Sequence, residues 1–433
     1  MFIDSGDKSE CFGCEACVQV CGVSAITMQE DAEGFRYPVV DYSLCVRCNK
    51  CRKVCPYENM PQMHEDDKYT FGGYHLNNSI RFDSTSGGAF SAIVEAFCDE
   101  NYVIFGAEAE GLKVFHSYVT DKSEIWRFRK SKYSQSIIGT AYRDAKRFLL
   151  EGRKVLFSGT PCQIAGLLSF LEGVNQDKLL TVEVICEGVP SPLYVRKLDD
   201  AIEAKYGARI ESIDYRYTGR SVFSRGKWDF QRMMLMLGKN TYWGGGTGRW
   251  DFEMMRITLM NKQKILTKDR WFNPFWSIWL QHLMSRPSCY RCKFASRGRT
   301  ADITLGDLWG VHIYCPELYG NNGGASLVVC NTSKGREVFR QAERFMYGHK
   351  LSFEEALKYQ SPMRKTISTN PNREAFMRDL RSGMSYRALA KKWAKKPTIK
   401  LLFQKYVWGN RQKVFVWNLK HAAMNIIRKK GKM

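Results

Sequence analysis

The 433-residue sequence lacks the features that mark membrane-spanning and secreted chains. No apolar run approaches the roughly 18 residues needed to cross a bilayer, because the longest, around Phe275 to Met284, is interrupted by Gln281 and His282. The first ten residues lack the basic segment and apolar core of a secretory signal. We therefore expect a cytoplasmic protein.

Acidic residues are absent from the last part of the sequence. No Asp or Glu follows Asp379, whereas fifteen Lys and Arg lie between Arg381 and Lys432 and supply most of the net charge of +22. The rest of the chain is only mildly basic, and a nucleic-acid-binding domain would be expected to carry its basic residues on a folded face. The sequence therefore predicts no nucleic-acid partner.

Cysteine, in contrast, is abundant, with fifteen residues. In a chain without a secretory signal they indicate metal ligands rather than disulfides. The pattern C-x2-C-x2-C-x3-C occurs twice, displaced by 34 positions, and zinc sites typically use two distant pairs instead. In two-cluster bacterial ferredoxins, three closely spaced Cys bind one 4Fe–4S cluster and the fourth binds the other. The pattern predicts one cluster on Cys11, Cys14, Cys17 and Cys55, and a second on Cys45, Cys48, Cys51 and Cys21.

A mixed α/β body is predicted after a polar linker at 57–68. An apolar strand at 152–159, a helical pattern at 160–173 and a strand at 179–186 indicate a crossover in a parallel sheet. The predicted fold class is α+β, with a ferredoxin-like N-terminal domain, a mixed α/β flavin and iron–sulfur body, and a basic helical tail. The expected domains are 1–62 for the two clusters, 68–150 for the flavin-binding part, 151–335 for the third cluster and substrate region, and 336–433 for the tail.

Four further cysteines occupy notable positions. Cys162 follows the first of these strands and Cys186 ends the second, so both are expected at the carboxyl edge of the sheet, where ligands bind in open α/β folds. Cys289 and Cys292 form a C-x2-C pair, and four thiolates suffice for a third cluster. Two alternatives are a buried Cys pair with a separate structural C-x2-C, and a redox-active Cys162 at a helix N-terminus.

Iron–sulfur clusters pass single electrons, whereas most organic substrates exchange two, and a flavin converts between them. Small residues at 84–89 precede a predicted helix and would let backbone amides approach a flavin or a phosphate. The same residues also suit an ordinary capped helix. The G-x-G-x-x-G dinucleotide motif is absent after any predicted strand.

Five ordered motifs resemble the coenzyme F-420 hydrogenase/dehydrogenase beta-subunit family: STSGGAFSAI, KSKYSQSIIG, FSGTPCQIAGL, CEGVPSP and RPSCYRCKFASRGRTADITLGDLWG. The resemblance covers roughly residues 1–335, including the ferredoxin domain that many members carry. It implies an FAD- and iron–sulfur-dependent oxidoreductase with a third 4Fe–4S cluster on Cys162, Cys186, Cys289 and Cys292. It also implies that FAD contacts Ser86, Gly87, Gly88, Ala89, Lys132, Tyr133, Ser136, Gly159 and Thr160.

The least matched stretch, 210–280, interleaves basic and aromatic residues, a pattern that suits an anionic flat or sugar-like ligand but also a plain basic loop. Relatives act on the deazaflavin coenzyme, on chlorophyll-type pigments, and on unknown substrates encoded among surface-polysaccharide genes. We expect an iron–sulfur flavoprotein that passes electrons between an external ferredoxin or another redox partner and an anionic small molecule, with surface-polysaccharide biosynthesis as one setting. The alternative is a non-catalytic electron-relay subunit of a larger redox complex. The sequence assigns no catalytic residue.

From Ser385 on, apolar and aromatic residues recur at helical spacing among Lys, beginning with Leu389 and Trp393. This pattern suits helices lying on an anionic membrane, which would place the protein peripherally at the inner face. The alternative is that these aromatics pack on the body and the lysines are simply solvated.

Overall fold

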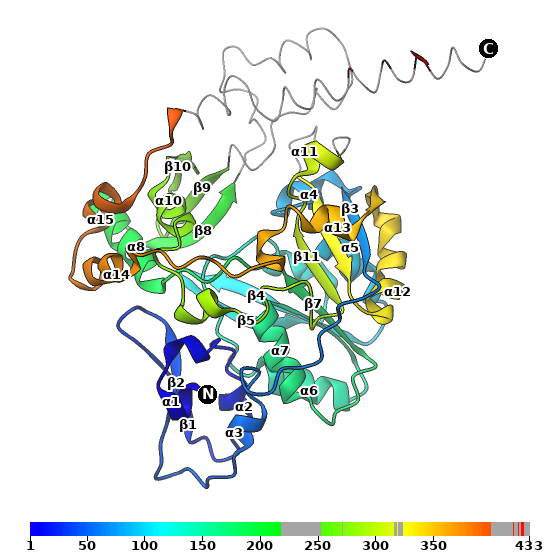
Figure 1. Ribbon diagram of the computed structural model, residues 1–433, viewed down its shortest axis with the longest axis horizontal. Helices are drawn as coiled ribbons and strands as arrows, with labels where there is room; N and C mark the ends of the chain where they lie inside the picture. The colour runs from blue at the N-terminus through cyan, green and yellow to red at the C-terminus, as the bar shows by residue number, and fades with distance from the viewer. Residues whose placement is uncertain are drawn as a thin grey trace.

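The computed structural model describes residues 1–217, 253–270, 272–315, 318 and 324–399, together with residues 419, 423, 426 and 427 of the tail. Figure 1 shows the N-terminal domain against one end of a larger mixed α/β body, with a smaller sheet and further helices beside it. None of the helices in the described residues is long and apolar enough to cross a membrane.

The N-terminal domain is built from short elements around its cysteine loops. They are α1 (Phe2–Ser5), η1 (Lys8–Glu10), α2 (Ala16–Val20), the antiparallel pair β1 (Ile26–Glu30) and β2 (Arg36–Val40), and α3 (Lys50–Lys53). The Asp31 carboxylate accepts hydrogen bonds from the amides of Glu33 and Phe35, both at 2.9 Å, and so shapes the turn between the strands. The ferredoxin-like domain expected from the repeat is therefore present.

An eight-stranded sheet forms the centre of the body, in the order β13-β3-β12-β11-β7-β6-β4-β5. Its strands are β3 (Tyr69–His75), β4 (Tyr102–Glu110), β5 (Lys113–Val119), β6 (Lys154–Gly159), β7 (Leu179–Val184), β11 (Ile303–Asp307), β12 (Ser326–Cys330) and β13 (Met346–Leu351). The inner strands β11, β7, β6 and β4 are parallel, so the predicted strand–helix–strand unit is confirmed as β6, α7 (Pro161–Phe170) and β7.

Helices cover both faces of this sheet. One face packs on α5 (Ala89–Phe97) and α12 (Ser333–Ala342), and the other on α6 (Ala141–Leu150) and α7. Neighbouring residues point to opposite faces, since Val103 belongs to the second core and Ile104 to the first. The other short elements of the body are α4 (Asn78–Asp83), η2 (Lys122–Phe128), η6 (Pro287–Arg291), α11 (Val311–Tyr314), η8 (Glu343–Phe345), α13 (Phe353–Leu357) and η9 (Ser361–Met363).

The expected boundary between body and tail at 335/336 is wrong. It falls inside α12, and β13 pairs antiparallel with β3 as an edge strand of the main sheet. The body therefore continues at least to residue 351. The short strand β13 mixes polar and apolar residues and stands between helical patterns, so its sequence alone did not predict a strand.

A third core joins a three-stranded sheet, β8 (Ile210–Tyr217), β9 (Met254–Leu259) and β10 (Lys264–Asp269), to helices α8 (Pro192–Tyr206), α10 (Pro274–Leu280), α14 (Arg373–Arg381) and α15 (Tyr386–Trp393). Leu389 is buried in this core, and the Trp393 indole donates a hydrogen bond to Asp379 at 2.7 Å. The membrane prediction is therefore wrong for α15, whose apolar residues pack on the body. Leu419, Ile426 and Ile427 are exposed, and most of the remaining tail lies outside the described residues.

Candidate metal centres

The structure brings the four cysteines assigned to the first cluster together. Cys11, Cys14, Cys17 and Cys55 line one small cavity, although Cys55 comes from the second repeat. Burial is the main cause that raises the pKa values of Cys14, Cys17 and Cys55, and neighbouring thiols raise them further. Holding these thiols as thiolates thus requires positive charge among them, which iron would supply.

The two cysteine loops have the same backbone conformation. Gly13 and Glu15 adopt φ values of 68° and 60°, and the residues 34 positions later, Arg47 and Asn49, adopt 53° and 57°. A non-glycine residue in this left-handed region costs roughly 1 kcal/mol, so three such residues at repeated positions indicate that the loops are shaped by a common task. In the first loop, the successive cysteines Cys11, Cys14 and Cys17 line one cavity.

The second set lies near the surface. Cys45 and Cys48 contribute to the raised pKa of Cys51, after burial, and Cys48 is exposed. Cys21, which the sequence assigns to this set, follows α2 and accepts a hydrogen bond from the Ala25 amide at 3.3 Å.

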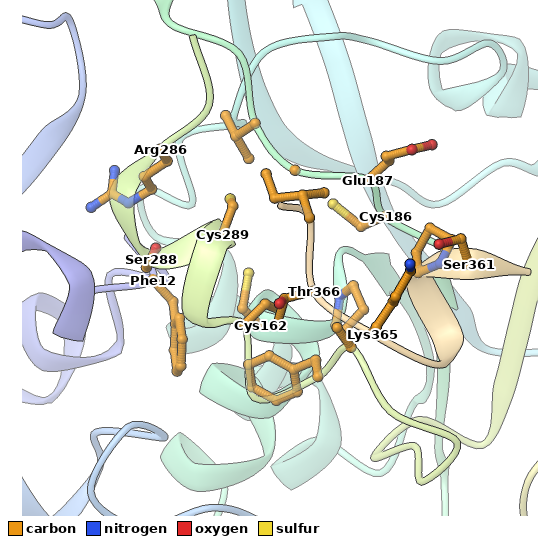
Figure 2. Close-up of a pocket in the computed structure, with 18 of the residues that line it drawn as sticks. Phe12, Cys162, Cys186, Glu187, Arg286, Ser288, Cys289, Ser361, Lys365 and Thr366 are labelled. Carbon is orange, nitrogen blue, oxygen red and sulfur yellow. The ribbon is translucent and has the colours of Figure 1, made fainter. Parts of the chain in front are cut away.

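Cys162, Cys186, Cys289 and Cys292, the third cysteine set, line a cavity of about 240 Å³. We call it the third cavity, after this third set. Cys162 lies in the first turn of α7 shortly after β6, Cys186 follows the parallel neighbour β7, and Cys289 lies in η6. Figure 2 shows the side chains of Cys162, Cys186 and Cys289 converging on the cavity. The C-x2-C pair is thus not a separate structural element.

The donor set of this third cavity fits a cluster. Within the described residues no three His, Cys, Asp or Glu side chains could hold a single metal ion, whereas a 4Fe–4S cluster needs four thiolates spread around a larger volume. Burial raises the pKa of Cys162 to about 11 and that of Cys289 to about 12, so these thiols also need a cationic partner to ionise.

Arg286 connects the first cysteine set to this cavity. Its guanidinium is only 1% exposed, donates from Nε to the Cys11 carbonyl at 2.9 Å, and lies 3.5 Å from the Cys11 Sγ through Nη2. The residue lines the third cavity, and Figure 2 shows its guanidinium pointing away from the cavity centre. Phe12 lines the same cavity and meets Phe294 edge-on, with ring centroids 5.2 Å apart.

Helix α7 also touches both cysteine sets. A Cβ added at Gly166 would lie 3.0 Å from the Cys14 Cβ and 3.1 Å from its Sγ. The same helix carries Cys162 in its first turn. The N-terminal domain is therefore docked with its first cysteine set beside the third cavity.

Several residues that line the third cavity were not predicted from the sequence. Ser361, Pro362, Lys365 and Thr366 line it from a segment beyond the stretch covered by the family resemblance. Arg286 and Phe12 were also missed, although each stands close in sequence to a predicted ligand. Their role depends on contacts between distant parts of the chain.

The residues expected to contact FAD have internal partners. The Gly87 amide donates to Ser326 Oγ at 2.8 Å, and a Cβ at Gly87 would meet the Gly73 carbonyl at 2.5 Å, so this glycine allows close packing of backbone on the sheet. Ser86 donates to the Ala325 carbonyl at 2.8 Å, Gly88 precedes α5 with φ 88°, and Ala89 is buried.

The remaining expected FAD contacts are equally engaged. Lys132 donates to the carbonyls of Arg127 and Arg129, and burial lowers its pKa to about 7. Ser136 bonds to His116 Nδ1 at 2.9 Å, and the Thr160 amide donates to Gln163. Tyr133 packs edge-on against Trp276 and Trp279, and a Cβ at Gly159 would meet Gln163 at 3.3 Å. The residues thus have partners within the protein, and their contact with FAD stays a prediction.

The proposed substrate stretch lies mostly outside the described residues. Its described basic residues are Arg216, Arg256, Lys262, Lys264, Lys268 and Arg270. Arg216 is buried and paired with Glu253 and Asp307, both at 2.8 Å. Asp302 accepts hydrogen bonds from Thr181 and Thr332 and is a structural residue.

Comparisons with known proteins agree with the motifs. Residues 152–350 match the family described as coenzyme F420 hydrogenase/dehydrogenase, C terminus of the beta subunit, and residues 10–59 match the 4Fe-4S dicluster domain. The family resemblance predicted from the motifs is confirmed.

Two relatives are similar over parts of the chain. The protein named as the F component of the F(420)H(2) dehydrogenase of Methanosarcina mazei is 24% identical over 189 residues, which are 41% of this chain and 53% of that protein. The chain thus aligns with about half the length of this relative. Among solved structures, a chain of the F420-reducing [NiFe] hydrogenase complex from Methanosarcina barkeri has 15% identity, and the similarity covers 70% of this chain and 97% of that one, at a TM-score of 0.40.

Proposed function

We propose that the chain is an iron–sulfur electron-transfer subunit of a larger redox complex, because residues 152–350 match the coenzyme F420 hydrogenase/dehydrogenase beta-subunit family and residues 10–59 match a 4Fe–4S dicluster domain. The observation that carries this proposal is the connection from Cys11 through Arg286 to the cavity of Cys289. It supports a continuous route for single electrons from the surface of the N-terminal domain into the body.

Each part of the route has a defined role in the proposal. Bound 4Fe–4S clusters supply one-electron transfer. The eight cysteines of the N-terminal domain would hold two of them, and a third would be held by Cys162, Cys186, Cys289 and Cys292. Arg286 and Phe12 fix the distance and exclude water between the first and third sets. Residues 361, 362 and 365–368 line the third cavity and would cover a cluster bound there.

The molecule that exchanges electrons with the third set is the subject of a finer proposal. The name of the M. mazei relative suggests a reduced deazaflavin coenzyme as the electron source or acceptor, and FAD would join its two-electron chemistry to the clusters. In that form the chain would be an oxidoreductase in its own right, acting on an anionic substrate, and surface-polysaccharide biosynthesis would be one setting. FAD binding is supported by the family resemblance, and flavin absorbance in anaerobically purified protein, released on denaturation, is its test.

Iron analysis tests the core of the proposal. Protein purified without oxygen should contain about twelve iron per chain, from three clusters of four. Cys289→Ser should lower this to about eight, while Cys98→Ser, at a buried cysteine in an apolar core, should leave it unchanged. Equal iron content in the Cys289→Ser and unmodified proteins would exclude the third cluster. Turnover of the deazaflavin coenzyme without added subunits would favour the enzyme over the relay.

A further inference from the structure

We propose that the loop face formed by Tyr42, Leu44, Val46, Arg47, Lys50 and Lys53 is the docking surface for a small acidic one-electron carrier protein of the ferredoxin type. The proposal rests on the proposed function, because it names where and from what kind of partner the electrons arrive. It is carried by a comparison of the two halves of the N-terminal repeat.

In the first half of the repeat, the residues equivalent to this loop face pack against the body of the same chain. Phe12 is 6% exposed and packs on Phe294, and the Phe12 carbonyl accepts a hydrogen bond from Gln135 at 2.7 Å. Ala16 is fully buried, and Gln19 accepts a hydrogen bond from the Tyr142 amide at 3.0 Å. The face is thus covered by the body, next to the third cavity.

The second half of the repeat presents the equivalent face to solvent. The residue 34 positions after Phe12 is Val46, which is 66% exposed, and those after Ala16 and Gln19 are Lys50 and Lys53, both exposed. The backbone has positive φ at the same two positions of both loops, at Gly13 and Glu15 and at Arg47 and Asn49, so the chain bends in the same way there. One copy of the face has its partner inside the chain, and the other is open beside the exposed Cys48.

Charge identifies the kind of partner for the open copy. Residues 42–53 contain Arg47, Lys50, Arg52 and Lys53 but no Asp or Glu, whereas the equivalent positions 13, 16, 18 and 19 are uncharged. Arg52 is paired with Asp4 at 2.6 Å. Cations around exposed apolar residues suit a partner with an acidic rim, and electrostatic attraction of this kind mainly speeds association.

The apolar residues complete the surface. Tyr42 and Leu44 are exposed on the same loop as Val46, and large apolar side chains in a cluster indicate a protein contact. A few apolar residues ringed by cations suit a small, transient interface, as in electron-transfer encounters. A carrier docked there would lie next to the thiols of Cys45 and Cys48, as the body in the first half lies next to Cys11.

Stopped-flow reduction of the cluster-loaded, full-length protein tests the proposal. The probe is a purified acidic two-cluster ferredoxin, photoreduced, and bleaching of the N-terminal clusters is recorded against salt concentration. The variant is Arg47→Glu with Lys50→Glu. The matched control is Arg344→Glu with Lys350→Glu, which changes the net charge equally at exposed positions of η8 and β13.

We expect the second-order rate constant to fall at least tenfold in the loop variant, to stay within about twofold in the control, and to decrease with salt in the unmodified protein. Reduction by dithionite, which needs no docking, should be equal in all three proteins. Equal slowing of both variants, no slowing of either, or a ferredoxin that cannot reduce the unmodified protein would overturn the proposal. So would loop-dependent binding to anionic vesicles with unchanged ferredoxin rates.

The experiment separates this proposal from the proposed function. Ferredoxin could reduce the N-terminal clusters through the loop face while no electron reaches the third set. In that case the docking surface stands and the electron-transfer route through Arg286 fails.

Discussion

Arg286 places a buried positive charge beside a cysteine that the sequence assigns to a cluster. Its Nη2 lies 3.5 Å from the Cys11 Sγ and donates to the Arg36 carbonyl, while Nε donates to the Cys11 carbonyl and Nη1 to Gln135. Reduction adds negative charge to an iron–sulfur cluster, so a nearby cation and a hydrogen bond to a ligand sulfur favour the reduced form. Arg286 holds the Cys11 loop against the body and would also raise the reduction potential of a cluster bound to Cys11.

Replacing Arg286 with Gln should lower the reduction potential of the cluster on Cys11 by about 60 mV, the one-electron equivalent of roughly 1.4 kcal/mol. Arg286→Lys keeps the charge and should lower it less. A redox titration followed by electron paramagnetic resonance measures both. If Lys and Gln lower the potential equally, the charge of Arg286 is not the cause.

His116 is buried with both ring nitrogens engaged, since Nε2 lies 2.9 Å from the Ser158 carbonyl and Nδ1 2.9 Å from Ser136 Oγ. Burial lowers its pKa to about 4. Between pH 6.5 and about 4, His116 is protonated in the unfolded chain but stays neutral in the folded chain. The free energy of unfolding therefore decreases as the pH falls through this window, by up to about 1.4 kcal/mol per pH unit.

His116→Gln should remove this part of the pH dependence. Its melting temperature is expected below that of the unmodified protein at pH 7.5, with the difference shrinking at pH 5.5. Thermal unfolding at the two pH values measures this. A constant difference would show that His116 does not titrate in the window.

Helix α7 is the element that holds the N-terminal domain against the body. Gly166 lies where Cys14 packs on the helix, and an added Cβ would also lie 3.0 Å from the Tyr142 hydroxyl. Three close contacts on one atom leave little room for relaxation. The helix thus needs glycine at this position because the Cys14 loop approaches it so closely.

Gly166→Ala should loosen the first cysteine set and cost about 1–3 kcal/mol of stability through overpacking. We expect a lower melting temperature and faster loss of up to about four iron during oxygen exposure. Gly22→Ala, where an added Cβ has no neighbour within 4 Å, is the control and should change neither. Unchanged iron retention in Gly166→Ala would show that α7 does not support the first set.

Elements with continuous local patterns could be predicted from the sequence. The β6–α7–β7 unit carries its own apolar strands and a Pro at the first helical position, and the ligand spacing defines the cysteine loops. The edge strand β13 could not be predicted, because MYGHKL owes its conformation to pairing with β3. The proximity of Cys162 and Cys186 could be predicted because they follow neighbouring strands. The contact of Arg286 with Cys11 could not, because the two residues are 275 positions apart in the sequence.

At the scale of the whole molecule, the N-terminal domain and the C-terminal segments meet around the same centre. Residues 361, 362 and 365–368 line the third cavity, and Arg373 pairs with Glu33 of the N-terminal domain at 2.7 Å. Helix α15 then packs into the core formed by α8, α10 and the small sheet. The C-terminal segments up to α15 are therefore part of the folded body, and the basic tail begins after them.

Two truncations should separate the body from the tail. Ending the chain at Lys396 keeps α15 and should leave the melting temperature within about 1 °C of the full-length value. Ending it at Met384 removes Leu389 and Trp393 from their core and should cost roughly 2–5 kcal/mol, because their removal leaves a cavity.

If the cations and apolar residues after Pro397 attach to anionic vesicles, as their spacing suggests, sedimentation with such vesicles should be lost in the chain ending at Lys396 and weaken with salt in the intact chain. Equal sedimentation of the intact chain and the chain ending at Lys396 would contradict a membrane role for the tail.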